Sequence, residues 1–177
     1  MMLEEKLKHI IRDVYDFPKP GIVFKDITPL LQDAQLCTEM VDVFLDKLKD
    51  CQLDAVAGIE SRGFLFGLML ANRLQVPFIS IRKQGKLPFH TISESYALEY
   101  GQATIEMHED AFPKGSKVLI HDDLLATGGT VVAASKLIEK LGGEVAGYCF
   151  VISLDFLNSQ GRLTRFSPHI FSLAHYK

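Results

Sequence analysis

Two adjacent acids and a glycine turn are the residues of this sequence best suited to chemistry. Asp122 and Asp123 are followed by the segment 126–130, which reads A-T-G-G-T. Two carboxylates can accept hydrogen bonds from a vicinal diol. Glycines let an anion approach the backbone, and threonine hydroxyls add donors. The pattern predicts a site for a phosphorylated sugar, with the ribose on the acids and the phosphate on the turn.

The flanking segments explain how these residues are positioned. The apolar run 118–120 precedes the acids and predicts a buried strand. After the turn, apolar residues recur with helical spacing at Val131, Ala134, Leu137, Ile138 and Leu141. The turn therefore lies at a helix N-terminus, where the first N–H groups lack intrahelical partners and attract anions. Open α/β sheets bind ligands at strand ends of this kind.

Three other ligand-binding motifs are missing from the sequence. It contains no GxGxxG, no GxxxxGK followed by Ser or Thr, and no HExxH. These motifs would indicate a dinucleotide site, a Walker-type nucleotide site and a zinc protease, respectively. The glycine turn after the acids therefore has to be interpreted by itself.

The segment 118–130 resembles the phosphoribosyl pyrophosphate signature of type I phosphoribosyltransferases, a hydrophobic run, two acids and A-T-G-G-T. Further stretches resemble the adenine phosphoribosyltransferases in order and spacing: Phe17–Pro29, Glu60–Gly67, Arg82–Pro88 and Tyr96–Gly101. The resemblance covers nearly the whole chain. It implies purine salvage, in which adenine and phosphoribosyl pyrophosphate give AMP and pyrophosphate through an oxocarbenium-like transition state.

The resemblance implies a role for each part of this site. Asp122 and Asp123 hold the ribose hydroxyls. Arg62 contacts the pyrophosphate, joined by Lys83 and Lys86, and a planar guanidinium suits bidentate contact with phosphate. Without this context, lysines beside a strand end are usually a solvated face. The 5′-phosphate is held by Ala126, Thr127, Gly128, Gly129 and Thr130.

Adenine recognition is expected in the segment 20–26. The resemblance implies that Phe24 stacks on the purine, that backbone groups of Val23 and Lys25 read its amino-pyrimidine edge, and that Leu124 also contacts the base. Adenine presents a donor and an acceptor where hypoxanthine and guanine present the reverse. Backbone groups matched to adenine therefore oppose like partners on those bases.

Catalysis is expected from a flexible flap over about 86–108. Glu99 and Tyr100 resemble the catalytic loop pair of the family, with Glu99 managing the proton of the adenine imidazole and Tyr100 excluding water. Arg62 completes the catalytic set. Mg²⁺ is expected to arrive on the pyrophosphate of the substrate, with no dedicated metal site in the protein. The resemblance also implies a cis peptide bond between Glu60 and Ser61.

The apolar pattern predicts an α/β fold with a mainly parallel central sheet and helices on both faces, the type I phosphoribosyltransferase fold. Strands are expected over 55–59, 77–82, 103–108, 118–120, 145–152 and 170–173, and helices over 3–14, 40–48, 64–74 and 130–141. The strand over 103–108 should have one wet side, and the helix over 64–74 should lie deep against the sheet. One domain is expected over 1–177, with a helix and a base-binding hood loop over about 1–35.

Composition limits the class of protein. The 177 residues include 19 basic and 22 acidic side chains, and the formal charge of −3 offers no general attraction to nucleic acid or an anionic membrane. No apolar run reaches the roughly 18 residues of a membrane-spanning helix. Three widely spaced cysteines form no CxxC pair, which fits a reducing compartment. We expect a cytoplasmic protein, and the resemblance implies a homodimer.

Three alternatives stay open at this level. His121 is interpreted as a strand-end histidine hydrogen-bonded to a neighbour, with sensing of phosphate charge as the alternative. The site would also suit a phosphoribosyltransferase of different base specificity, against which the adenine-type loop argues. A regulator that binds phosphoribosyl pyrophosphate without catalysis is the third alternative, and the presence of Arg62, Glu99 and Tyr100 argues against it.

Overall fold

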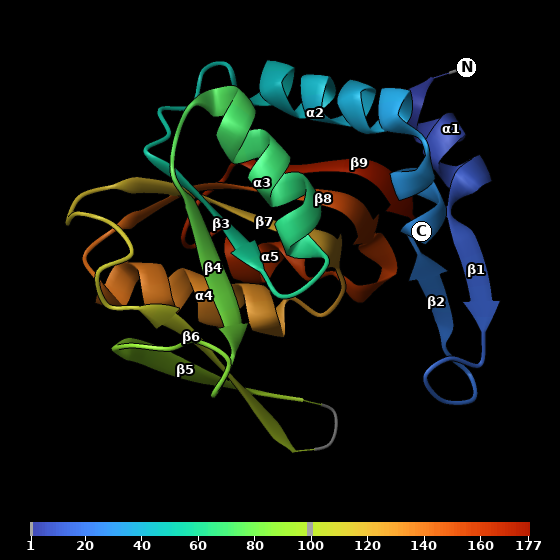
Figure 1. Cartoon of the computed structure of the whole chain (residues 1–177). Coiled ribbons are helices and arrows are strands. Elements are labelled where there is room, and N and C mark those ends of the chain that lie inside the picture. The colour runs from blue at the N-terminus through green and yellow to red at the C-terminus, as the bar shows by residue number, and fades with distance from the viewer. Residues whose placement is uncertain (1, 99–100) are drawn as a thin grey trace.

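The computed structural model describes residues 2–98 and 101–177, and Figure 1 shows their arrangement. Within these residues a seven-stranded sheet has the order β5-β6-β4-β3-β7-β8-β9, and β1 and β2 form a separate two-stranded sheet. The strands are β1 (Arg12–Tyr15), β2 (Val23–Asp26), β3 (Ala55–Ile59), β4 (Phe78–Lys83), β5 (Thr91–Ala97), β6 (Gln102–His108), β7 (Lys117–Leu125), β8 (Glu144–Leu154) and β9 (Ile170–Tyr176). The helices are α1 (Leu3–Ile10), α2 (Ala34–Leu48), α3 (Gly63–Leu74), α4 (Gly129–Lys140) and α5 (Gln160–Leu163), with short 3-10 turns η1 (Thr28–Gln32) and η2 (Asp155–Leu157).

The large sheet is mainly parallel, as predicted. Strands β4, β3, β7, β8 and β9 run parallel to one another, whereas β6 is antiparallel to both β4 and β5. Strand β3 lies between β4 and β7, so the carboxyl ends of these three strands meet at one edge of the sheet. The expected last strand is confirmed at the sheet edge and extends to Tyr176.

Helices cover both faces of the sheet, which also confirms the prediction. Successive residues of β7 point to opposite faces, so Leu119 joins one core with α1, α2 and α3 while Ile120 joins a second core with α4 and α5. Figure 1 shows α2 and α3 on one face and α4 on the other. The acids that follow Ile120 in β7 are therefore held by a strand that is packed on both sides.

The N-terminal segment differs from the sequence prediction. Helix α1 ends at Ile10 instead of continuing to Val14, which lies in β1 and pairs with Phe24 of β2. The expected loop at Phe17–Pro29 is thus partly a hairpin. Its prolines lie outside the two strands, where no ladder hydrogen bond is lost. The four-residue strand β2 was missed because it is too short for an alternating pattern to stand out.

Helices α2 and α3 also depart from expectation. The first begins at Ala34, because the Asp33 carboxylate accepts a hydrogen bond of 2.9 Å from the backbone N–H of Leu36 and caps the helix. The second is not buried all round. Leu65, Leu68 and Met69 are 42, 57 and 36% exposed, and they recur with the spacing of one helix face.

The β5–β6 hairpin was predicted only in part. Strand β6 is confirmed, but its expected wet side is wrong at Glu106, which is 5% exposed. Strand β5 lies where no regular structure was predicted, and its Glu94 carboxylate pairs with Lys136 at 2.9 Å and Lys140 at 2.5 Å on α4. These ion pairs hold the hairpin against the helix that begins at the glycine turn.

None of the helices that the structure describes is both long enough and apolar enough to cross a membrane.

Candidate active site

A cavity of about 200 Å³ lies at the carboxyl ends of β3, β4 and β7. Its lining includes Ile59, Glu60, Ser61, Arg62, Ile81, Arg82, Lys83, Tyr96, Ile105, Asp122, Asp123 and Thr130. A larger hollow of about 440 Å³ lies between β5, α4 and α5, but neither acid lines it. The smaller cavity therefore brings together the two aspartates, two guanidinium groups, a lysine and the start of α4.

Asp122 and Asp123 lie toward the carboxyl end of β7. Asp123 is 4% exposed, and its Oδ2 is 2.9 Å from Nε of Arg62, an ion pair without hydrogen-bond alignment. The backbone N–H of Asp123 donates to Oδ1 of Asp122 at 2.9 Å. Burial raises the pKa of both carboxyls, and the charge of Asp123 raises the pKa of Asp122 further. The charge of Arg62 opposes both shifts.

Arg62 is positioned by the way in which α3 begins. Gly63, the first residue of the helix, packs so closely on β7 that an added Cβ would lie 2.8 Å from the carbonyl oxygen of His121. The absence of a side chain lets α3 start directly against the strand, which places Arg62 beside the acids. The peptide bond between Glu60 and Ser61 is cis, which confirms the prediction.

The glycine turn leads from β7 into α4. Gly128 has φ +79°, a left-handed conformation that favours glycine, and α4 begins at the next residue. The backbone N–H of Val132 donates to the carbonyl oxygen of Gly128 at 2.9 Å, and the N–H groups before it have no intrahelical partner. Since Thr130 lines the cavity, this helix N-terminus adjoins the two acids.

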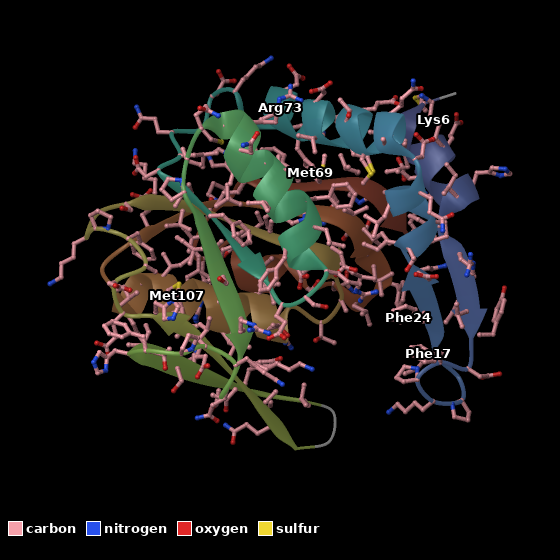
Figure 2. The ribbon with its side chains drawn as sticks, viewed as in Figure 1. Lys6, Phe17, Phe24, Met69, Arg73 and Met107 are labelled. Carbon is pink, nitrogen blue, oxygen red and sulfur yellow. The ribbon has the colours of Figure 1, made fainter. Side chains whose placement is uncertain are left out.

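The β1–β2 hairpin lies beside Arg62, at the start of α3. The Phe24 ring lies 4.8 Å from the Arg62 guanidinium and packs edge-to-face against Phe17 at 5.1 Å, as Figure 2 shows for the two labelled rings. Lys25 directs its ammonium to Asp13 at 2.6 Å, which leaves its backbone as the part able to contact a base. Val23 and Lys25 are two positions apart, so their backbone polar groups point to the same edge of β2.

The cavity takes in only part of the predicted site. The predicted site residues that do not line it, among those the structure describes, are Val23, Phe24, Lys25, Lys86, Leu124, Ala126, Thr127, Gly128 and Gly129. Leu124 packs against the first core. Glu99 and Tyr100 lie outside the described residues.

Among the charged and aromatic residues of the lining, sequence reasoning named no side-chain role for three, Glu60, Arg82 and Tyr96. Each belongs to a stretch that carried the family resemblance, and Arg82 opens its basic cluster. Those stretches were therefore the available signal for all three positions.

His121 does not point toward the site. Its ring is 0% exposed, lies 5.9 Å from the Phe44 ring and 6.5 Å from the Phe66 ring, and neither ring nitrogen has a hydrogen-bond partner within the described residues. The expected hydrogen bond to a neighbour is therefore wrong. Burial lowers the pKa of His121 to about 4, and a backbone interaction with Cys149, outside hydrogen-bond geometry, opposes this shift.

Comparison with known proteins identifies similar chains. A family model described as "Phosphoribosyl transferase domain" matches residues 31–164. The adenine phosphoribosyltransferase of Cytophaga hutchinsonii is 55% identical over 175 residues, 99% of this chain and 97% of that protein. The crystal structure of the Thermoanaerobacter pseudethanolicus enzyme has a TM-score of 0.93 at 46% identity, covering 97% of this chain and 99% of that one.

A third similar protein was solved with ligands. The Saccharomyces cerevisiae adenine phosphoribosyltransferase, complexed with adenine and D-2,5-dideoxy-2,5-imino-altritol 1,6-bisphosphate, has a TM-score of 0.89 at 37% identity. The match covers 97% of this chain and 98% of that one.

Proposed function

This chain belongs to the adenine phosphoribosyltransferase family, and on that premise we propose that it transfers the 5-phosphoribosyl group of phosphoribosyl pyrophosphate to adenine, giving AMP and pyrophosphate in purine salvage. One observation carries this assignment. Asp122, Asp123, Arg62 and Thr130 line a single cavity, so acceptors for ribose hydroxyls, a cation for pyrophosphate and a helix N-terminus for the 5′-phosphate lie together.

The carboxylates of Asp122 and Asp123 accept the ribose 2′ and 3′ hydroxyl hydrogen bonds. The segment 126–130 holds the 5′-phosphate through first-turn N–H groups of α4 and the hydroxyls of Thr127 and Thr130. Because Gly128 has φ +79°, the turn can bring these N–H groups toward one point without backbone strain. These contacts fix the ring and leave C1′ open toward the hairpin.

Pyrophosphate binds to Arg62 and to the lysines Lys83 and Lys86. Arg62 is paired with Asp123 at 2.9 Å, so a bound substrate brings its own anion to a guanidinium already held in place. Magnesium enters with the substrate, whose phosphate oxygens suit a hard dication and whose charge needs neutralisation.

Adenine lies against Phe24, with backbone groups of Val23 and Lys25 at its amino-pyrimidine edge and Leu124 beside it. The position of Phe24 next to Arg62 supports this placement, since base and pyrophosphate must both lie near C1′. In the reaction a bond forms between the adenine imidazole nitrogen and C1′ as the bond from C1′ to the pyrophosphate oxygen breaks. Glu99 accepts the imidazole proton, and Tyr100 excludes water and contacts phosphate.

The setting of the enzyme is also part of the proposal. Residues 1–177 act as one domain, with a hood over about 1–35 and a flap over about 86–108. We place the protein in the cytoplasm as a homodimer. The three cysteines are free thiols, which suits a reducing compartment, and the exposed apolar face of α3 suits contact with a second copy.

The assignment is tested by incubating the protein with adenine, phosphoribosyl pyrophosphate and Mg²⁺ and measuring AMP and pyrophosphate. We expect equal amounts of both products, and no turnover when hypoxanthine or guanine replaces adenine. Arg62→Ala should raise the KM for phosphoribosyl pyrophosphate by about tenfold or more, because a charged hydrogen-bonding partner is lost. Arg73→Ala is the matched control, since Arg73 pairs with Asp42 at 2.7 Å on the surface.

The alternatives have distinct outcomes in the same assay. Folded protein that binds phosphoribosyl pyrophosphate but makes no AMP would identify a regulator. Equal turnover of hypoxanthine would identify a different base specificity. In single-turnover measurements, Glu99→Ala should lower the rate by about 10²–10⁴, the range typical of acid–base groups, and an unchanged rate would remove that role.

A further inference from the structure

Glu60 and Arg82, which both line the cavity, form an ion pair with each other. Nε and Nη2 of Arg82 donate to the two carboxylate oxygens of Glu60 at 3.2 and 2.9 Å, and the backbone N–H of Lys83 donates to the same carboxylate at 3.0 Å. The hydrogen bond from Arg82, with smaller help from Lys83 N–H and nearby charges, lowers the pKa of Glu60 despite its burial. The segment that carries Arg62 is thereby tied to the end of β4.

The remaining edge of the Arg82 guanidinium reaches the turn after β4. Nη1 of Arg82 donates to the carbonyl oxygen of Lys86 at 2.9 Å. Glu106 lies directly opposite Arg82 in the β4–β6 register, and its Oε1 accepts from the backbone N–H groups of Lys86 at 3.1 Å and Leu87 at 2.9 Å. The backbone of Lys86 is thus held on both sides, at its N–H by Glu106 and at its carbonyl by Arg82.

Glu106 differs from Glu60, Asp122 and Asp123 in that it does not line the cavity. It is 5% exposed, and its hydrogen bonds go to backbone N–H groups of the turn. Neither Lys83 nor Lys86 has an ion-pair partner within the described residues. The ammonium groups of both lysines and the guanidinium of Arg62 are all positive and repel one another. Holding them close together therefore requires a fixed backbone.

We propose that Glu106 and Arg82 are positioning residues, which hold the 83–87 turn against the 60–62 segment so that the cationic groups of both meet one pyrophosphate. The inference rests on the proposed function and deepens it. Groups held in place before the ligand arrives need less ordering when it binds, which favours binding. Loss of either residue therefore weakens pyrophosphate binding and leaves adenine binding intact.

A positioning role and a simple charge effect predict opposite changes in pyrophosphate affinity when Glu106 loses its charge. If Glu106 acted on the anion only through its charge, removing that charge would strengthen pyrophosphate binding. A positioning role requires the acceptor oxygen instead. Glu106→Gln and Glu106→Met remove the same charge and are similar in size, but only the glutamine keeps an oxygen for the two backbone N–H groups.

The experiment measures the dissociation constant of magnesium pyrophosphate by calorimetry, and the KM values of phosphoribosyl pyrophosphate and adenine. Glu106→Met should weaken pyrophosphate binding by about tenfold, with the KM for adenine unchanged. The half-buried N–H of Leu87 loses its acceptor, and the N–H of Lys86 keeps only the long turn bond of 3.2 Å to the carbonyl oxygen of Lys83. Glu106→Gln should stay close to the wild type. Equal effects of the two variants, or tighter binding in both, would overturn the proposal. Glu39→Met is the charge-matched control, since Glu39 pairs with Lys6 at 2.8 Å away from the site.

A second variant keeps the test decisive if Glu106→Met does not fold. Arg82→Lys preserves the charge, but one ammonium cannot reproduce the fork that reaches both Glu60 and the Lys86 carbonyl. We expect about tenfold weaker pyrophosphate binding, and unchanged binding would contradict positioning. Arg73→Lys, at the surface pair with Asp42, is its control.

A wild type that makes no AMP would instead overturn the proposed function, whereas an active wild type with unaffected variants overturns only this inference.

Discussion

Phe24 joins the two halves of the proposed site, since its ring lies beside the Arg62 guanidinium and belongs to the hairpin proposed to bind the base. We expect Phe24→Ala to raise the KM for adenine by about tenfold, because a stacking surface is lost, while the KM for phosphoribosyl pyrophosphate changes much less. Steady-state kinetics with each substrate varied in turn checks this split. Phe156→Ala, at a ring 58% exposed outside the cavity, serves as the control. An equal rise in both KM values would mean that the ring acts mainly by holding Arg62.

His121 is a second residue whose environment makes a measurable prediction. Its buried ring nitrogens lack hydrogen-bond partners within the described residues, and a buried unsatisfied polar group costs about 1–3 kcal/mol. His121→Leu should therefore raise the free energy of unfolding at pH 7, as measured by urea denaturation. A less stable variant would contradict this expectation.

The same residue predicts how stability depends on pH. The pKa of His121 is about 4 in the folded protein and about 6.5 when exposed, so between these values the unfolded chain binds a proton that the folded chain does not. This contribution is present above pH 6.5 and is lost as the pH falls toward 4. Between pH 7.5 and 5 the wild type should lose about 2 kcal/mol more than His121→Leu. Parallel pH profiles of the two proteins would contradict the assignment.

At the level of elements, the start of α3 is a closely packed junction near the site. An added Cβ at Gly63 would lie 2.8 Å from a backbone oxygen of β7, so Gly63→Ala must shift the helix away from the strand. We expect a loss of stability of about 1–3 kcal/mol from this overpacking, and a raised KM for phosphoribosyl pyrophosphate because Arg62 moves from Asp123. Gly161→Ala, with nothing within 4 Å of its added Cβ, is the matched control. Full stability and activity of Gly63→Ala would rule out this packing role.

The helices and strands were predictable where burial produces a recognisable pattern of apolar residues, either a continuous run or a helical spacing. Residues 118–120 and 145–152 are apolar because their strands are covered on both faces, and α4 was found from its helical spacing. Strand β2 and the exposed face of α3 were not predictable in this way. Strand β2 is only four residues long, so it has too few residues to show an alternating pattern. The exposed face of α3 is as apolar as a buried face, so only the tertiary arrangement shows that it is exposed.

At the level of the whole molecule, the exposed face of α3 bears on assembly. Figure 2 labels Met69 on α3, and Leu68 is 57% exposed on the same helix. If this face joins two copies, Leu68→Lys should convert the dimer to a monomer, as measured by sedimentation velocity. Leu157→Lys, which places the same charge at another exposed leucine, should leave the assembly unchanged. If Leu68→Lys remains a dimer, the interface does not include this face of α3.

The candidate site was predictable only in its local parts. Asp122, Asp123 and the segment 126–130 lie within nine consecutive positions, so their spacing alone suggested a ribose phosphate. Arg82 and Glu106 are 24 positions apart, and their opposition depends on the β4–β6 register, which no local pattern encodes. Residues that hold other residues in place therefore became visible only in the folded chain.

The position of β3 at the centre of the sheet has a consequence for synthesis on the ribosome. Ala55 pairs with Val118, 63 positions later, whereas Val56 pairs with Phe78 much sooner. In a growing chain, the proposed pyrophosphate side of the site is therefore synthesised before the strand that carries Asp122 and Asp123. During that interval one edge of an apolar strand has no partner, and such edges associate readily with other chains. A pause in translation before residue 118 would prolong the time during which this strand edge is unpaired and open to association with other chains.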